Sequence, residues 1–388
     1  MNCFIIIILN CKMSYRLSRN DIRFLKVMYK LSHFLSITPN YDFENFVIIS
    51  PRCDKISAIC FLLSTILGTC WIIYVRIYCK EIRFFEISFE ILGSLDSLIL
   101  LMVLVSIILG SLKTKEWAKL NNKFQYIDEK LKTRDQKERN LFKNAYFQLV
   151  LSISVYSSSV GYTQYVRIAA KGLPTLKLFA LHEFYGFCYL WVLILICNIA
   201  LAFKQRYQLI NEQMAVRINP KNCASFVIEV RKLSRLLGEM VGLFNDIFGW
   251  PLVFITGRFV IKILVALNFF TSTLEIDNLY LKHKLEISSL VQTAITLVAM
   301  CGLVLICDSA KSESQQTVFL CYKLMEKFPE RSHEQQELYM AAQVIEKSVA
   351  NFTAAGFFDV KRSTLFGILA TTTTYLIVTI QFNQGLNK

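Results

Sequence analysis

Long apolar stretches separated by short polar ones run along most of the chain. A helix needs about 20 mostly apolar residues to cross a lipid bilayer. Seven stretches meet that requirement, the fifth of them interrupted only by Arg258 and Lys262. We expect these two cations to lie toward one end of their span, where long side chains reach the membrane surface. The predicted spans are residues 56–79, 87–112, 145–166, 179–203, 251–274, 288–308 and 363–382. This pattern predicts an all-α membrane protein with seven transmembrane helices.

Three polar segments between the spans carry helical patterns of their own. In residues 113–143, apolar side chains recur at steps of three and four, as on one face of an amphipathic helix. Residues 204–249 and 331–352 show similar spacing. These helices are expected to extend the spans beyond the membrane. They either form a hub where subunits meet or pack against one another within one subunit. The face in the first segment consists of Trp117, Leu120, Phe124, Ile127 and Leu131.

The composition agrees with a membrane protein. Hydrophobic residues make up 54% of the 388 positions and charged residues 19%, whereas soluble domains are about 45–50% apolar and about 25% charged. The net charge is +14. In a soluble protein that excess suggests nucleic-acid binding, but in a membrane protein it is expected in the cytoplasmic loops. The positions of the basic residues decide between these alternatives.

The basic residues lie mostly on one side of the predicted spans. Of the 43 lysines and arginines, 32 fall in residues 1–55, 113–143, 204–249 and 309–362, and 8 fall in the segments on the other side. This bias places the N-terminus in the cytoplasm and the C-terminus outside the cell. A G-protein-coupled receptor has the opposite polarity. Because the positive charge is spread over four segments facing anionic lipid, we expect the lipid bilayer as a partner and no nucleic acid.

The spans divide the chain into five parts. The opening MNCFIIIIL is too short for a span and lacks the features of a signal peptide, so we expect none. The parts are a cytoplasmic N-terminal segment at 1–55, six membrane helices with cytoplasmic extensions at 56–308, further cytoplasmic helices at 309–362, the seventh helix at 363–382, and an extracellular tail at 383–388.

No arrangement of reactive residues indicates an enzyme. The 12 cysteines include no C-x-x-C pair, and the 4 histidines lack zinc-binding spacing. The motifs of serine hydrolases, P-loop proteins and zinc proteases do not occur. We therefore expect no catalysis, no cofactor and no metal. His182 and Glu183 open the fourth span, where they can touch a ligand, although a solvated helix start is the commoner arrangement.

The last span carries a stripe of small or polar residues. A polar stripe on a spanning helix must face protein or water. Several copies of the helix around an axis can enclose a pore, with a narrowing at Val378, Gln381 and Phe382 that closes by dewetting. Tight helix packing through glycine and threonine is the alternative. The stripe recurs at steps of four and three and consists of Gly367, Thr371, Thr374, Val378 and Gln381.

The end of this span resembles a family signature. TYLIVTIQF, at residues 374–382, matches the pattern TYhhhhhQF (h, hydrophobic) that closes insect gustatory receptors, with Thr379 as its one departure. GFFD, at residues 356–359, is also similar to the family's approach to this helix. The motif is short, but the length, the seven spans, their polarity and the brief tail after Phe382 agree with the family along the whole chain.

The resemblance implies a ligand-gated, non-selective cation channel in the plasma membrane of chemosensory neurons. It implies a homo- or heterotetramer of related receptor subunits around the last span. The cytoplasmic helices then form an anchor domain, which favours the hub. Gln381 and Phe382 are placed at the gate. Together with the stripe, the expected pore and gate residues are Thr371, Thr374, Tyr375, Val378, Gln381 and Phe382.

The resemblance also implies a ligand pocket within each subunit, among the second to sixth spans in the outer half of the membrane. The ligand is expected to be a small-molecule tastant, with bitter compounds as the broadest expectation. Aromatic walls with a few polar groups suit such ligands. Asp96 is the most unusual candidate, because a carboxylate inside an apolar span is costly unless a ligand or a polar helix meets it. The candidates are Asp96, Tyr162, Gln164, Tyr185, Asn268, Thr271 and Gln292.

Two other functions remain open on sequence grounds. A seven-helix receptor that signals through a cytoplasmic partner has the right number of spans but the wrong polarity. A secondary transporter would show paired halves with broken helices in matching places, and the odd number of spans argues against a simple repeat. The sequence leaves open the identity of the ligand, whether partner subunits are needed, and whether translation starts at Met1 or Met13.

Overall fold

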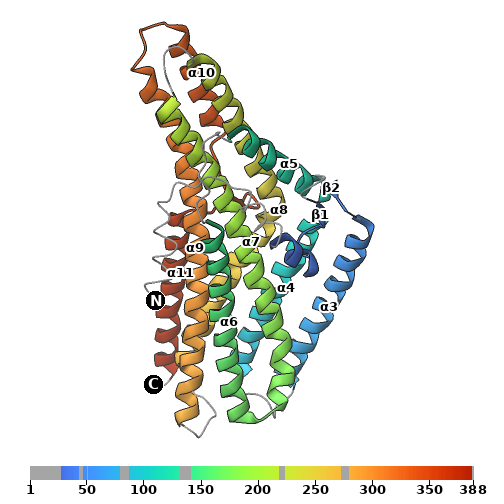
Figure 1. The fold of residues 1–388 in the computed structure, drawn as a ribbon. Helices are drawn as coiled ribbons and strands as arrows, with labels where there is room; N and C mark the ends of the chain where they lie inside the picture. The colour runs from blue at the N-terminus through green and yellow to red at the C-terminus, as the bar shows by residue number, and fades with distance from the viewer. Residues whose placement is uncertain are drawn as a thin grey trace.

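The structure is a computed structural model that describes residues 28–42, 47–49, 51–78, 87–131, 141–217, 223–271 and 279–386. Within these residues the chain is almost entirely helical, with two short antiparallel strand pairs. Seven long helices of this part run alongside one another in Figure 1, and each contains all or nearly all of one predicted span. They are α3 (Pro51–Tyr78), α4 (Ile87–Ser111), α6 (Leu141–Lys171), α7 (Pro174–Arg217), α8 (Cys223–Thr271), α9 (Leu279–Met325) and α11 (Arg362–Leu386).

The helices have the composition that a bilayer requires. By length and composition, α3, α4, α7, α8 and α9 can each cross a membrane, while α6 and α11 hold the predicted third and seventh spans. The outward face of α3 is apolar. A broad apolar surface of this kind is expected where lipid rather than water surrounds a helix. Its exposed members include Ile59, Leu63, Leu67, Trp71 and Tyr74.

Three helices are far longer than the membrane is thick. α7, α8 and α9 have 44, 49 and 47 residues, which is about 66–74 Å at about 1.5 Å per residue. The hydrocarbon core is about 30 Å thick. Their surplus forms the narrower upper part of Figure 1, together with α10 (His333–Lys347), and α5 (Thr114–Leu131) packs against α8 below it. The polar segments therefore continue these predicted spans as helices.

The predicted amphipathic face of α5 packs into the bundle. Phe124 is half-buried, and its ring lies 4.2 Å from the guanidinium carbon of Arg206. Arg206, on α7, also forms a buried ion pair with Asp128 at 2.7 Å. This side of α5 therefore combines apolar packing with one paired charge. The remaining members of the predicted face are all buried, namely Trp117, Leu120, Ile127 and Leu131.

A proline lies inside α8 without ending it. Pro251 has no N–H, so the carbonyl of Ile247 one turn earlier loses its usual helical partner. α4 approaches α8 at this point, since a Cβ placed on Gly110 would lie 2.9 Å from the Ile247 oxygen. The close approach of α4 covers the carbonyl that the proline leaves free. The predicted span beginning at residue 251 is thus the outer half of a continuous helix.

A small hairpin leads into α11. β3 (Thr353–Ala354) pairs antiparallel with β4 (Phe358–Asp359), and Ala355 and Gly356 between them have positive φ angles of 49° and 78°. Two such residues in succession form the tight turn that favours glycine at its second position. The GFFD sequence noted above is the second half of this hairpin. A second pair, β1 (Tyr41–Asp42) with β2 (Val47–Ile48), lies near the start of the described chain.

Asn351 provides a test of the orientation. It belongs to the single N-x-S/T sequon of the sequence and lies on the cytoplasmic side assigned by the basic residues. Its amide nitrogen donates to Asp359 at 2.9 Å, and its oxygen accepts from Lys311 at 2.7 Å. We expect no glycan on Asn351 and a glycan on a sequon-bearing tag added after Lys388, measured as mobility shifts after endoglycosidase treatment. A glycan on Asn351 would contradict the orientation.

Candidate functional site

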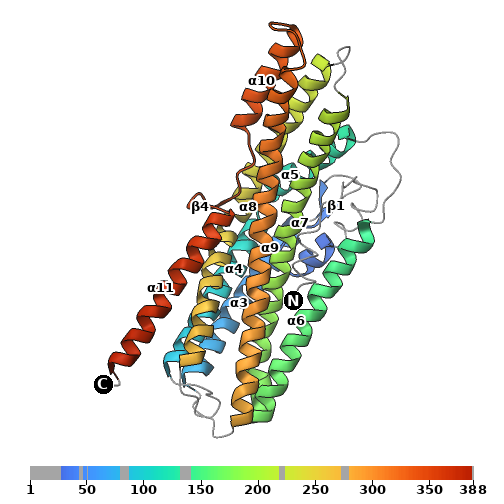
Figure 2. The same cartoon turned by 90° about the vertical axis from the view of Figure 1, so that its left-hand side faces the viewer.

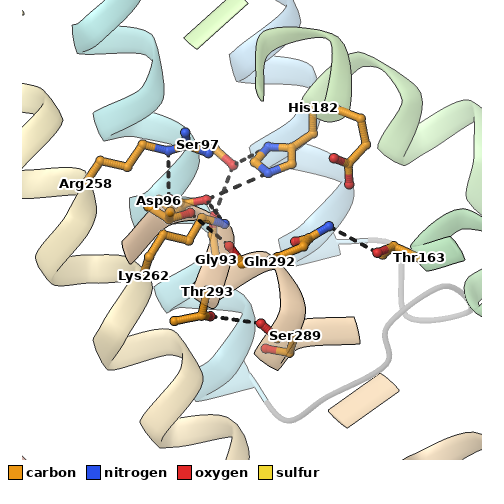
Figure 3. Close-up of polar contacts among 12 residues, drawn as sticks. Gly93, Asp96, Ser97, Thr163, His182, Arg258, Lys262, Ser289, Gln292 and Thr293 are labelled. Atoms are coloured by element: carbon orange, nitrogen blue, oxygen red, sulfur yellow. Dashed lines mark hydrogen bonds and ion pairs between the residues drawn. The ribbon is translucent and has the colours of Figure 1, made fainter. Parts of the chain in front are cut away.

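A cluster of buried charged side chains lies in the outer half of the bundle, where α4, α7 and α8 meet (Figure 3). Asp96 of α4 is 3% exposed. Its Oδ1 accepts a hydrogen bond from Arg258 Nε at 3.2 Å, and its Oδ2 lies 2.8 Å from Lys262 Nζ. His182 Nε2 of α7 is 3.7 Å from the same Oδ2. One carboxylate therefore faces two cations and an imidazole.

Arg258 and Lys262 do not reach the membrane surface, so that expectation from the sequence is wrong. Arg258 is 5% exposed, and its guanidinium carbon lies 4.1 Å from the centre of the Tyr189 ring. The two cations are about one turn apart and share one face of α8, and that face is turned toward α4. Asp96 meets them there although it is 162 positions away in the sequence.

Two further ion pairs join the outer parts of neighbouring helices. Arg76 Nη1 of α3 is 3.3 Å from Glu90 Oε2 of α4. Arg167 Nη1 of α6 is 3.0 Å from Glu183 Oε1 of α7. The ring of Phe179 contacts both guanidiniums, with its centre 5.2 Å and 4.2 Å from their carbon atoms. Each of these pairs balances one cation with one carboxylate.

His182 and Glu183 do not form a solvated helix start, so that expectation is also wrong. His182 is 7% exposed, and Glu183 is occupied by Arg167. The reason is the helix boundary, since α7 begins at Pro174 and these two residues lie about two turns inside it. Ser97 Oγ donates to the Gly93 carbonyl at 3.0 Å and lies 3.4 Å from His182 Nδ1.

A cavity opens beside the Asp96 cluster, between α6, α7, α8 and α9. Its empty volume is about 560 Å³ with its mouth included. Leu190, Leu193, Ile295 and Ala299 supply apolar lining, and Tyr189 supplies an aromatic one. An apolar enclosure with a few fixed polar groups is the usual form of a small-molecule site. Its polar lining consists of Ser159, His182, Glu183, Arg258, Lys262, Gln292 and Thr296, besides the tyrosine hydroxyls.

A glycine brings a second aromatic ring to the cavity. A Cβ on Gly186 of α7 would collide with the hydroxyl of Tyr156 from α6. The missing side chain lets the Tyr156 ring lie against α7, where its hydroxyl donates to the Glu183 carbonyl oxygen at 3.3 Å. Both Gly186 and Tyr156 line the cavity. The position of this aromatic wall therefore depends on glycine.

Two of the predicted ligand residues belong to this site. Gln292 lines the cavity and donates from Nε2 to Thr163 Oγ1 at 3.1 Å, as Figure 3 shows. Asp96 lies directly behind the lining and holds two of its members, Arg258 and Lys262. Asp96 thus meets a polar partner helix, which was one of the two roles considered for it.

The other predicted ligand residues lie elsewhere or outside the described side chains. Tyr185 faces α3, where its hydroxyl donates to the Ser64 carbonyl oxygen at 3.1 Å. Tyr162 is 38% exposed. Gln164 is 8% exposed, and its side-chain amide has no hydrogen-bond partner among the described residues. The side chains outside the described part are those of Asn268 and Thr271.

Sequence reasoning missed most of the lining. The available signal was charge matching, because Arg258 and Lys262 in one apolar span require a carboxylate in another, and Asp96 was the candidate. Ser159 and Tyr156 gave no such signal, since hydroxyl groups and aromatic rings are common in spans. Among the described residues no three histidine, cysteine, aspartate or glutamate side chains are grouped to hold a metal ion.

α11 lies at the edge of the bundle, and in Figure 2 its C-terminal end stands apart from the other helices. Its buried residues, Leu365 and Thr372, lie on the side that packs against α8 and α9. The described members of the predicted stripe are exposed instead. They therefore do not pack against helices of their own chain. These members are Gly367, Thr371, Thr374 and Gln381, while the side chains of Tyr375, Val378 and Phe382 lie outside the described part.

Comparisons with known proteins agree with the seven-helix architecture. A family model described as 7tm Chemosensory receptor matches residues 25–385. The insect olfactory receptor OR5 from Machilis hrabei is similar in structure, with a TM-score of 0.65 and 12% identity over 93% of this chain and 98% of that chain. Its complex with eugenol gives a TM-score of 0.61 and 12% identity over 94% and 100% of the two chains. The predicted all-α, seven-helix fold is thereby confirmed. A search of curated protein sequences finds no match.

Proposed function

Because the chain belongs to the 7tm chemosensory receptor family, we propose that it is a gustatory receptor that acts as a ligand-gated, non-selective cation channel. Small-molecule tastants open it, with bitter compounds as the broadest class. It works in the plasma membrane of chemosensory neurons as a tetramer, either of identical chains or with related subunits. The seventh helix of each subunit lines the pore.

The observation that carries this proposal is the exposed stripe of α11. Gly367, Thr371, Thr374 and Gln381 face away from their own subunit, yet they lie on the helix that we propose as the seventh membrane span. Contact with lipid is unfavourable for hydroxyl and amide groups, because lipid offers them no hydrogen bonds. Copies of the helix around an axis turn these groups toward water and toward each other, which is the arrangement of a pore.

The same two helices connect the cavity with the start of the pore helix. α8 and α9 line the cavity, and both also hold the segment that leads into α11. Asn245 of α8 accepts a hydrogen bond from the Thr353 backbone at 3.0 Å. Asp308 of α9 lies 2.9 Å from Arg362 at the first residue of α11. A ligand that moves α8 against α9 therefore also moves the support of α11.

The test is a current evoked by a ligand. Cells without chemoreceptors of their own would express the chain, alone and with related subunits, and receive a panel of small molecules during voltage clamp. We expect an inward current that reverses close to zero voltage, because a non-selective pore passes sodium and potassium alike. A chain that reaches the surface and binds a ligand but passes no current in either setting would contradict the channel and favour signalling through a cytoplasmic partner.

A further inference from the structure

The charges around the cavity indicate the chemical class of its ligand. Building on the receptor function proposed above, we infer that the cavity binds a small molecule with an apolar body and an anionic group such as a carboxylate. Lys262 is the residue that pairs with that group. Three features of the site support it: the charge balance of the buried ion pairs, the position of Lys262 and the chemistry of the remaining lining.

Among the described residues, the three ion-pair groups built on Glu90, Asp96 and Glu183 do not balance. The three groups described above contain four cations but three carboxylates. Two groups are matched one to one, whereas Asp96 alone serves both Arg258 and Lys262. His182, the fourth member of that group, adds a neutral or positive side chain and no negative charge. The cations are Arg76, Arg167, Arg258 and Lys262, and the carboxylates are Glu90, Asp96 and Glu183.

The surplus positive charge lies at the cavity wall. Arg258 and Lys262 line the cavity, whereas Asp96 lies behind them. The Arg258 side chain is 6% exposed and is covered by the Tyr189 ring, but the Lys262 side chain is 17% exposed. An ammonium group has three N–H donors, and Asp96 accepts at 2.8 Å from one side. Lys262 is therefore the cation that an entering anion meets.

Burial makes this surplus positive charge unfavourable in free energy. A cation removed from water needs a counter-charge or strong hydrogen bonds. A ligand carboxylate would supply the counter-charge and give the group of Asp96, Arg258 and Lys262 two negative charges for two positive ones. Glu183 also lines the cavity, but Arg167 holds its carboxylate at 3.0 Å, so that charge is already matched.

The other residues that line the cavity indicate the chemistry of the rest of the ligand. Leu190, Leu193 and Ile295, together with the two tyrosine rings, accept an aromatic or aliphatic body. Ser159 is 9% exposed, and its hydroxyl has no hydrogen-bond partner among the described residues. This hydroxyl is a free donor within the lining, ready for a second oxygen of the ligand. The site thus fits an acid on an apolar body better than an amine or a neutral hydrocarbon.

The test compares acids with their neutral amides. The probes are benzoate, phenylacetate and hexanoate, each paired with its primary amide, added to the purified full-length receptor in detergent. Binding is measured as the concentration-dependent rise in the midpoint of thermal unfolding, which does not require the channel to open. We expect at least one acid to raise the midpoint at a concentration at which its amide does not.

The variants assign the effect to one side chain. Lys262→Met leaves Arg258 paired with Asp96, so we expect it to fold, and it should raise the half-saturating concentration of the acid by about tenfold or more. Lys262→Arg keeps the charge and should retain a preference for the acid over the amide. Lys123→Met, on α5, removes a lysine that does not line the cavity and should leave acid binding unchanged. Gel filtration confirms that each variant is folded.

The outcomes separate this inference from the proposed function. Amides that bind as well as acids, no binding by any acid, or full acid binding by Lys262→Met would each overturn it. If neutral compounds evoke currents but no acid binds, the proposed channel function is supported and the proposed anionic ligand is contradicted. Acid binding that depends on Lys262 but opens no channel would support the ligand class and count against the channel.

Discussion

Replacing Asp96 with asparagine is expected to cause the largest loss of stability among single substitutions in the outer half of the bundle. The amide keeps the size of the carboxylate but removes its charge, so Arg258 and Lys262 remain buried without their counter-charge. Removing one partner of a buried ion pair costs about 3–5 kcal/mol, and this substitution affects two cations at once. We expect a matching fall in the free energy of unfolding, observed as a lower midpoint of thermal unfolding in detergent and less protein at the cell surface.

An exposed ion pair provides the matched control. Glu239 accepts from Lys123 at 2.9 Å, with its side chain 46% exposed. Glu239 is charged at neutral pH like an ordinary glutamate, and the hydrogen bond from Lys123 lowers its pKa further. Glu239→Gln therefore also removes one charge, but water replaces the lost partner and the cost is about 0–1 kcal/mol. An Asp96→Asn variant no less stable than Glu239→Gln would show that the two buried cations do not depend on Asp96.

A double variant tests the charge balance itself. Asp96→Asn combined with Lys262→Met leaves one uncompensated cation, Arg258, instead of two. We expect the double variant to be more stable than Asp96→Asn alone, because the loss of Lys262 removes part of the penalty. Such non-additivity is the signature of side chains that interact directly. Additive losses would instead indicate that Asp96 and Lys262 act on stability independently.

The membrane explains why the helices could be predicted from the sequence. A bilayer requires long apolar segments with satisfied backbones, so the pattern is visible without any tertiary contact. The helices outside the predicted spans could be predicted from the sequence for a related reason. Trp117 and Leu120 repeat at helical spacing because one side of α5 faces α8 and the other faces solvent. The ends of the helices were harder to predict, since α8 runs through Pro251 and α7 begins before its predicted span.

The cavity could not be predicted in the same way. Periodicity identifies the polar face of one helix but not the face that it meets on another. Asp96 and Arg258 are 162 positions apart, and their pairing follows from how α4 packs on α8. Treating Arg258 and Lys262 as surface-seeking side chains assumed that each span satisfies its charges alone. In a bundle of seven helices, a charged residue inside one span is better interpreted as evidence for an opposite charge inside another.

Replacing Gln381 with alanine is expected to raise the current that flows without ligand. Gln381 is an exposed polar residue near the outer end of α11, and the proposed tetramer brings four copies of it to the axis. Amide side chains in such a ring narrow the pore and can bond to one another in the closed state, at about 0.5–1.5 kcal/mol each. Because about 1.4 kcal/mol changes an equilibrium tenfold, their loss should raise the resting open probability by about tenfold or more. The measurement is the resting whole-cell current, normalised to surface protein.

The control for this prediction lies two turns back on the same helix. Thr373 is also exposed, but it lies beside the stripe, and its hydroxyl donates to the Leu369 carbonyl of its own helix at 2.8 Å. Thr373→Ala should leave the resting current unchanged. Gln381→Ala should also leave the order of ligand preference unchanged, because the cavity is built by α6 to α9. Lys262→Met should do the reverse, altering which ligands act without opening the resting channel. If Gln381→Ala changes neither the resting current nor the response to ligand, the narrowing lies elsewhere along α11.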